Sequence, residues 1–321
     1  MLRRGIICHF VIAACLTTLS PARTQSADDA SKQAAQISDN PLRSARTLAD
    51  SGDLEQARKL IVEYLGSHPN SSEAHFLLGY ILFKQQKSSE SLAAYTEGAK
   101  YGTPGAGDLK TVALNYVLLG DYASADRWLT HSVAFDPKDA QAWYYLGRTK
   151  YNENRFEEAI AAFRECLKLD PNNVKAKDNL GLSYQGLGRT ADAVSAFKEA
   201  IAWQKQSLDK NAGPFLNMGI LLLEQNKVEG ALEYLLQSAE VAPNDSRTHE
   251  QLGKAYSRLN EFEKAQAELE RAVALSPESS SLHFMLGQLY RKRGMMDKAK
   301  VELDRGAALK LSERKNAPGV E

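Results

Sequence analysis

Cysteine is scarce in this chain: Cys8, Cys15 and Cys166 are the only three among 321 residues. Two of them lie near the start, in a segment with the features of a cleavable leader, so only Cys166 would remain in a processed chain. A single cysteine cannot form an internal disulfide, and no pair of histidines or cysteines has the spacing of a zinc site. We therefore expect no disulfide, no metal and no cofactor, and we predict that Cys166 is a small buried core residue.

The net charge is zero, because 40 basic side chains balance 40 acidic ones. A nucleic-acid-binding domain is usually basic, so the balance gives no support for a nucleic acid partner. Catalytic motifs are missing as well. No GxSxG sequence occurs, and the glycines of residues 102–107 are not followed by the Gly-Lys-Ser/Thr of a phosphate-binding loop. We expect no catalytic residues and predict that the protein is not an enzyme.

Long apolar runs are confined to the first 22 residues. Arg3 and Arg4 precede a largely apolar stretch over 6–19, and Ser20-Pro21-Ala22 supplies small residues. This layout is typical of a secretory signal peptide cleaved after Ala22, which would place the protein outside the cytoplasm, in a periplasm or secreted. A second interpretation stays open: Ile12-Ala13-Ala14-Cys15 resembles a bacterial lipobox, and acylation of Cys15 would anchor the chain to a membrane. Residues 23–37 are small and polar and predict a linker.

A period of 34 residues fills most of the remaining chain, and it is clearest in residues 140–173. That stretch predicts two amphipathic helices, the first with Trp143, Leu146 and Gly147, the second with Ala159 and Phe163. The same offsets return in eight segments: 38–71, 72–105, 106–139, 140–173, 174–207, 212–245, 246–279 and 280–313. Self-similarity of this length predicts a solenoid built from one repeated helix pair.

The residue types that recur at fixed positions of the period each have a physical reason. Small residues at the eighth and twentieth positions let the two helices of a pair approach closely. Gly or Asn near the fifteenth suits the turn between them, because both tolerate left-handed backbone. Proline at the thirty-second position ends the second helix. His75, His249 and His283 share the fourth position with Trp143, so we predict that they pack against neighbours rather than bind a metal.

This pattern resembles the tetratricopeptide repeat family over residues 38–313. The resemblance implies an all-α fold, a right-handed superhelical α-solenoid of helix-turn-helix repeats. It also implies a non-enzymatic scaffold that binds a protein or peptide in a concave groove.

Two departures from the period divide the array. Four extra residues, 208–211, separate repeats one to five (38–207) from repeats six to eight (212–313), and Lys205 stands where neighbouring repeats have proline. We expect the second helix of repeat five to continue for about one further turn and to form a joint near 205–213. Residues 314–321 form a polar tail.

In the family, the groove is lined by the first helices, chiefly at positions two, five, nine, twelve and thirteen. On this basis we predict an aromatic region followed by a basic one, made of Phe76, Tyr80, Phe83, Lys110, Tyr144, Arg148, Tyr151, Arg247, Lys254 and Arg258. Two alternatives stay open: the aromatic stripe can equally pack in a core, and the basic strip can be a solvated face.

The resulting hypothesis is an exported scaffold that binds a protein or peptide segment in its groove. The alternative is a membrane-tethered envelope assembly or secretion accessory factor, which requires the anchor at Cys15. The carboxylate clamp that holds chaperone tails is not expected, because no three consecutive repeats supply its lysine and asparagine set.

Overall fold

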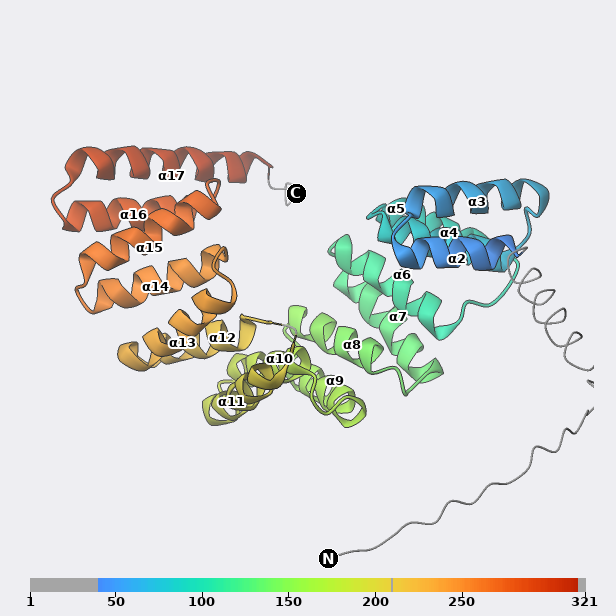
Figure 1. Cartoon of the computed structure of the whole chain (residues 1–321), viewed down its shortest axis with the longest axis horizontal. Helices are drawn as coiled ribbons and strands as arrows, with labels where there is room; N and C mark the ends of the chain where they lie inside the picture. The colour runs from blue at the N-terminus through green and yellow to red at the C-terminus, as the bar shows by residue number, and fades with distance from the viewer. Residues whose placement is uncertain (1–39, 209, 317–321) are drawn as a thin grey trace, which may run out of the picture. The chain divides into compact units, whose positions relative to one another are not determined.

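A computed structural model describes residues 40–208 and 210–316. The predicted signal peptide with Cys15, the linker of residues 23–37, and the last five residues lie outside the described residues. The chain divides at residue 103 into two compact units, which we describe separately: unit 1 ends at Thr103, and unit 2 begins at Pro104. All regular structure in the described residues is helical, as predicted (Figure 1).

Unit 1 contains two helix pairs: α2 (Pro41–Ser51) with α3 (Leu54–Ser67), and α4 (Ser72–Lys84) with α5 (Ser88–Gly98). The first pair includes a proline near its start, which left the sequence pattern there weak. Pro41 is the first residue of α2, where its missing N–H costs no helical hydrogen bond. Repeat one is therefore a complete helix pair.

Unit 2 contains six further pairs in chain order. They are α6 (Ala106–Leu118) with α7 (Tyr122–Phe135), α8 (Ala140–Asn152) with α9 (Phe156–Leu169), α10 (Val174–Gly186) with α11 (Thr190–Gln206), α12 (Gly213–Glu224) with α13 (Val228–Val241), α14 (Ser246–Arg258) with α15 (Phe262–Leu275), and α16 (Ser280–Lys292) with α17 (Met296–Asn316).

Local sequence sets where these helices begin and end. Asp53, Ser71, Asp121, Asn173 and Asp245 are N-caps whose side chains accept a hydrogen bond from a first-turn N–H. Five second helices end two residues before the proline of the period, as at Leu169 before Pro171. The residue before a proline disfavours helical backbone, so the proline ends each helix in advance.

The fifteenth position of the period is the turn within every pair. Among the described residues, positive φ angles occur only there, at Gly52, Gln86, Gly120, Asn154, Gly188, Asn226, Asn260 and Gly294. Glycine and asparagine account for all but Gln86, as expected for left-handed backbone. The sequence therefore predicted the turn chemistry of the array correctly, with one exception.

Close approach within a pair depends on the glycine at the eighth position. A Cβ atom on Gly147 would lie 2.6 Å from the ring of Phe163, and one on Gly181 would lie 2.5 Å from the ring of Phe197. Both phenylalanines are fully buried. In repeat two, where Ser91 replaces the small apolar residue, its hydroxyl donates a 2.7 Å hydrogen bond to the Gly79 carbonyl. A polar group is thus accommodated in the core because it has a partner.

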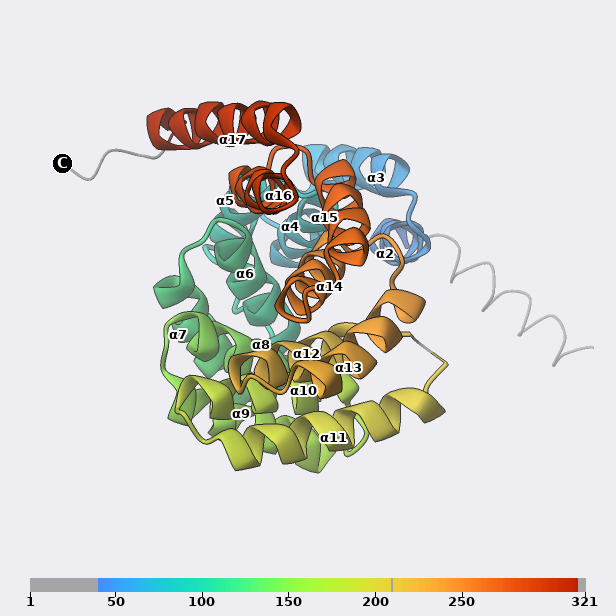
Figure 2. The same cartoon turned by 90° about the vertical axis from the view of Figure 1, so that its left-hand side faces the viewer.

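First helices of successive repeats contact one another in unit 2, from α6 through α8, α10 and α12 to α14, and the same holds for α2 and α4 in unit 1. Within each unit, the described second helices pack mainly against the first helices beside them, and Figure 2 shows α9 and α11 on the outer side of unit 2. The helix α11 has 17 residues, against 14 for α9 and α13, so the predicted extension of repeat five is confirmed. The first helices α6 to α14 therefore form one continuous row in unit 2, and α2 and α4 do so in unit 1.

Candidate functional site

The predicted aromatic residues of unit 1 are largely engaged in packing. Phe76 is 9% exposed, and a Cβ atom on Gly98 of α5 would lie 2.6 Å from its ring. Phe76 is therefore a core residue, which corrects the expectation that it lines an open groove. The Phe76 ring packs against α5, because Gly98 has no side chain and leaves room for it.

Tyr80 joins the first helices of unit 1. Its hydroxyl donates a 3.0 Å hydrogen bond to Asp50, and the Arg46 guanidinium lies 4.6 Å from the ring centroid. Burial, and then the bond to Asp50, raises the pKa of the Tyr80 hydroxyl. Phe83 is half-buried. These contacts tie α4 to α2, so Tyr80 is only partly available to a partner.

In unit 2, Lys110 also has internal partners. Its ammonium lies 2.6 Å from Asp139 and donates a 3.0 Å hydrogen bond to Gln141, which links α6 to the start of α8. Burial opposes ionisation of Asp139, yet the Lys110 bond holds the pKa of that carboxyl below its ordinary value. The predicted polar anchor is thus a bridge between repeats three and four.

Repeat four offers a mixed surface. Tyr144 and Tyr151 are half-buried against the core around Phe163, and Tyr151 meets Phe156 edge-on at 5.4 Å. Burial raises the pKa of the Tyr144 hydroxyl. Arg148 is exposed and lies 5.9 Å from the Tyr144 ring centroid. The exposed residue of this surface is therefore Arg148, beside the half-buried ring of Tyr144.

The basic residues of repeats seven and eight surround a hollow of about 230 Å³ between α14 and α16. Leu269, Met285 and Leu289 give it an apolar floor, while Lys254, Arg258 and Lys292 bring three cationic side chains to its lining. Arg247 lies about two turns before Lys254 on α14 and is exposed. The structure therefore brings two of the three predicted basic residues together and adds Lys292, at the thirteenth position of repeat eight.

The three cations of the hollow differ in their partners. Lys254 lies 2.5 Å from Glu250, and Arg258 donates to the Leu223 carbonyl at the end of α12. In repeat two, Lys84 makes the equivalent bond to the Ala49 carbonyl at 2.8 Å. Lys292 occupies the same repeat position but has no hydrogen bond or ion pair with another described residue. Its ammonium is the cation of the hollow that is open to a ligand.

The fourth-position rings have a structural role. Trp143 donates from Nε1 to the Pro137 carbonyl at 3.0 Å, and the Nε2 atoms of His249 and His283 lie 3.0 and 2.9 Å from the corresponding proline carbonyls. The Nδ1 atoms of the two histidines lie 2.6 Å from Glu268 and Glu302. These rings join each helix pair to the preceding turn, which agrees with the packing role predicted for them.

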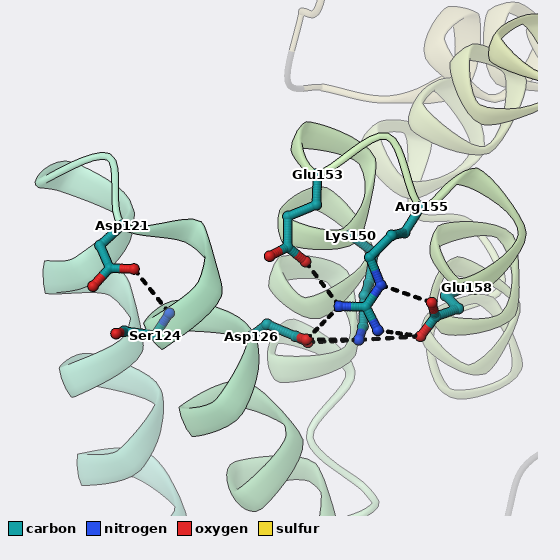
Figure 3. Close-up of polar contacts among 7 residues, drawn as sticks. All are labelled: Asp121, Ser124, Asp126, Lys150, Glu153, Arg155 and Glu158. Atoms are coloured by element: carbon teal, nitrogen blue, oxygen red, sulfur yellow. Dashed lines mark hydrogen bonds and ion pairs between the residues drawn. The ribbon is translucent and has the colours of Figure 1, made fainter. Parts of the chain in front are cut away.

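A charge network between repeats three and four, in which Lys150 is buried, Asp126 and Arg155 are half-buried and Glu158 is exposed, was missed by sequence reasoning (Figure 3). Lys150 is 8% exposed and lies 2.7 Å from Asp126 of α7 and 3.2 Å from Glu158 of α9. Arg155 pairs with both carboxylates at 2.6 Å and with Glu153 at 3.0 Å. The Glu158 and Asp126 bonds raise the pKa of Arg155, so it stays charged. A signal was present: Lys150 holds the eleventh position, where four other repeats have tyrosine.

Other candidate chemistry is limited in the part of the chain that the structure describes. No group of three or more His, Cys, Asp or Glu residues there could hold a metal ion. Cys166 is fully buried, as predicted, and burial raises the pKa of its thiol to about 11. Within 40–208 and 210–316, no helix has the length and apolar character needed to cross a membrane.

Comparison with known proteins agrees with this architecture. Tetratricopeptide repeat models match residues 42–106, 140–173, 174–207 and 250–318. A tetratricopeptide repeat protein from Parabacteroides merdae has a TM-score of 0.63 at 18% identity, covering 78% of this chain and 96% of that one. The structure of pilF from Pseudomonas aeruginosa has a TM-score of 0.56 at 17% identity, covering 69% and 97%.

Hsp70-Hsp90 organizing protein 1 of Glycine max is 27% identical over 129 residues, which is 40% of this chain and 23% of that protein. The chain spans less than a quarter of the length of the curated relatives it matches. The fold and the repeat matches define an α-solenoid scaffold, and the chain belongs to the tetratricopeptide repeat family. Members of this family are typically non-enzymatic scaffolds for protein interaction.

Proposed function

We propose that the protein is an interaction scaffold whose first-helix face in unit 2 binds a protein segment that carries a carboxylate. The observation that carries this proposal is the hollow between α14 and α16. It combines an apolar floor with an ammonium, that of Lys292, which has no partner among the described residues. A carboxylate with a neighbouring aliphatic side chain matches both parts of that lining.

Charge and size both favour such a ligand. Lys254 is paired with Glu250, whereas Arg258 donates to a neutral carbonyl and so keeps its positive charge at the lining of the hollow. A hollow of about 230 Å³ suits one side chain and its carboxylate rather than a whole folded domain. An extended segment would continue along α14, where exposed Arg247 offers a further cation.

The test uses two labelled eight-residue peptides that end in Glu-Leu, one with a free carboxylate and one with a terminal amide. Fluorescence anisotropy should show tighter binding of the free acid, with affinity that falls as salt rises. Lys292→Ala should weaken binding about tenfold, the loss of one charge-assisted hydrogen bond.

Lys198→Ala is the matched control, because Lys198 is an exposed lysine on the second helix α11. It should bind the peptide like the unchanged protein. Equal binding of the acid and the amide, or equal loss in both lysine variants, would contradict the proposed site.

We further propose that residues 1–22 direct export and are removed after Ala22. The basic start, the apolar stretch and the small residues before the cut support this proposal. The alternative, a membrane-tethered assembly or secretion factor, is favoured by the lipobox-like residues that end at Cys15. Mass spectrometry of the mature N-terminus distinguishes them: an unmodified start at Arg23 supports cleavage, and an acylated Cys15 supports the tether.

A further inference from the structure

A buried carboxyl group lies at the junction between repeats five and six. Asp178 of α10 is 6% exposed, and its two carboxyl oxygens lie 2.9 and 3.0 Å from the Nδ2 atom of Asn217 on α12. Asn217 donates to both, so this one amide connects the first helices of the two repeats. Asp178 holds the fifth position of its repeat, which the family pattern places on the groove side of the first helix. In this protein the start of α12 covers that position.

The start of α12 is packed directly against this carboxyl. A Cβ atom on Gly213 would lie 2.9 Å from the Oδ2 atom of Asp178, so only glycine fits without a shift. The Gly213 N–H already donates to Asn211, and Pro214 has no N–H. The first two residues of α12 therefore offer the carboxyl no backbone hydrogen bond.

No cation among the described residues pairs with Asp178. The first seven residues of α12, 213–219, contain no ionisable side chain. From α8, the Tyr144 hydroxyl has a pKa raised by burial and, to a lesser extent, by Asp178, and the cation over its ring, Arg148, is exposed. From α11, Glu199 lies 2.9 Å from Lys177 of α10. From α9, Arg164 donates to Tyr184 at the other end of α10. An ionised carboxylate in this site would be desolvated with only one amide to stabilise it, which is costly.

We propose that Asp178 makes the junction of repeats five and six sensitive to pH, closed when its carboxyl is protonated and loosened when it ionises. Loosening separates the start of α12 from α10, because water must reach the carboxylate to stabilise its charge. The junction is also where α11 is extended and extra residues interrupt the period, so it can change without disturbing regular repeats on either side. Burial raises the pKa of Asp178 to about 7, which places the change near neutral pH.

Hydrogen exchange of the full chain tests this proposal. After correction for intrinsic rates, amides of residues 215–219 should exchange about tenfold faster at pH 8 than at pH 6. That factor corresponds to ionisation of one group with a midpoint near 7 in the closed state. In Asp178→Asn the difference between the two pH values should disappear, because the amide does not ionise.

Asp304→Asn, on an exposed residue of α17, is the matched control and should keep the pH dependence. A ¹³C NMR titration of the unchanged protein decides the matter even if Asp178→Asn does not fold. A midpoint for the Asp178 carboxyl near pH 7 supports the proposal. A midpoint below pH 5, or the same pH dependence in Asp178→Asn as in the control, would overturn it.

Discussion

Single residues in this chain are constrained mainly by what lies opposite them in the helix pair. The eighth position illustrates this, because the five glycines that hold it in repeats four to eight would each place a Cβ atom within 2.8 Å of a side chain at the twenty-fourth position. The facing residues are Phe163, Phe197, Leu235, Leu269 and Leu303. A glycine at this position is therefore required by packing and not by backbone conformation.

Gly181→Ala should lower the free energy of unfolding by about 1 to 3 kcal/mol, the usual cost of overpacking a core. The buried ring of Phe197 must shift to admit the methyl group. Gly230→Ala is the control: its Cβ atom would meet only Leu222 at 3.8 Å, so it should be neutral or slightly stabilising. Urea denaturation compares the free energies of unfolding of the two variants. Equal stability of the two variants would argue against the packing explanation.

In the charge network around Lys150, each residue depends on its charged partners, so removing one partner should destabilise the protein. Asp126→Ala should cost roughly 3 kcal/mol, because the buried Lys150 ammonium would keep only the exposed Glu158 as a partner. Adding Lys150→Met should recover part of this loss by restoring an apolar eleventh position. Thermal unfolding followed by circular dichroism reports both variants, and an additive double variant would indicate that the two residues are not coupled.

At the scale of an element, the extended helix α11 is the main departure from the repeat. Most other second helices end before a proline, but α11 runs to Gln206 and includes Lys205, which is exposed. The residue at this position therefore determines where the second helix ends. The sequence predicted this extension from the missing proline and the extra residues.

Lys205→Pro should destabilise the protein by about 3 kcal/mol, because proline within a helix removes a hydrogen bond and clashes with the preceding turn. Lys205→Ala should change stability little, since the side chain is exposed. Chemical denaturation monitored by circular dichroism at 222 nm compares the two. A proline variant as stable as the alanine variant would mean that the last turn of α11 does not contribute to folding.

At the scale of the molecule, stability is approximately a sum of terms from single repeats and from the junctions between neighbours, so a perturbed junction lowers the total by its own contribution. Asp178 provides a test with a definite sign. Burial raises the pKa of the Asp178 carboxyl in the folded protein to about 7, from its ordinary value of 3.8. Between these values the unfolded chain loses the proton while the folded chain keeps it, so stability falls as pH rises from about 4 to about 7.

The unfolding free energy should decrease across that range by up to about 4 kcal/mol, since each pKa unit corresponds to 1.36 kcal/mol. Above pH 7 this contribution should stay constant. Asp178→Asn should flatten the profile between pH 4 and pH 7 and should be more stable than the unchanged protein at pH 8. Urea titrations at a series of pH values measure this profile, and an unchanged slope in the variant would contradict the assignment.

The sequence alone determined the period, the helix pairs, their turns and their ends, because each depends on residues within one repeat. Glycine or asparagine at position fifteen, the small residues at position eight and the proline at position thirty-two act locally, and their meaning does not depend on distant partners. The buried thiol of Cys166 and the packed histidines followed from the same register.

Only the tertiary structure decided which first-helix residues remain open. Phe76 is covered by its own helix pair, Tyr80 and Lys110 are engaged by the neighbouring repeat, and Asp178 is covered by α12. The distances that bury or free a side chain are set by how adjacent repeats stack, and stacking depends on residues in two repeats at once. Lys292 is open for the same reason: α14 and α16 leave a hollow beside it that no period in the sequence encodes.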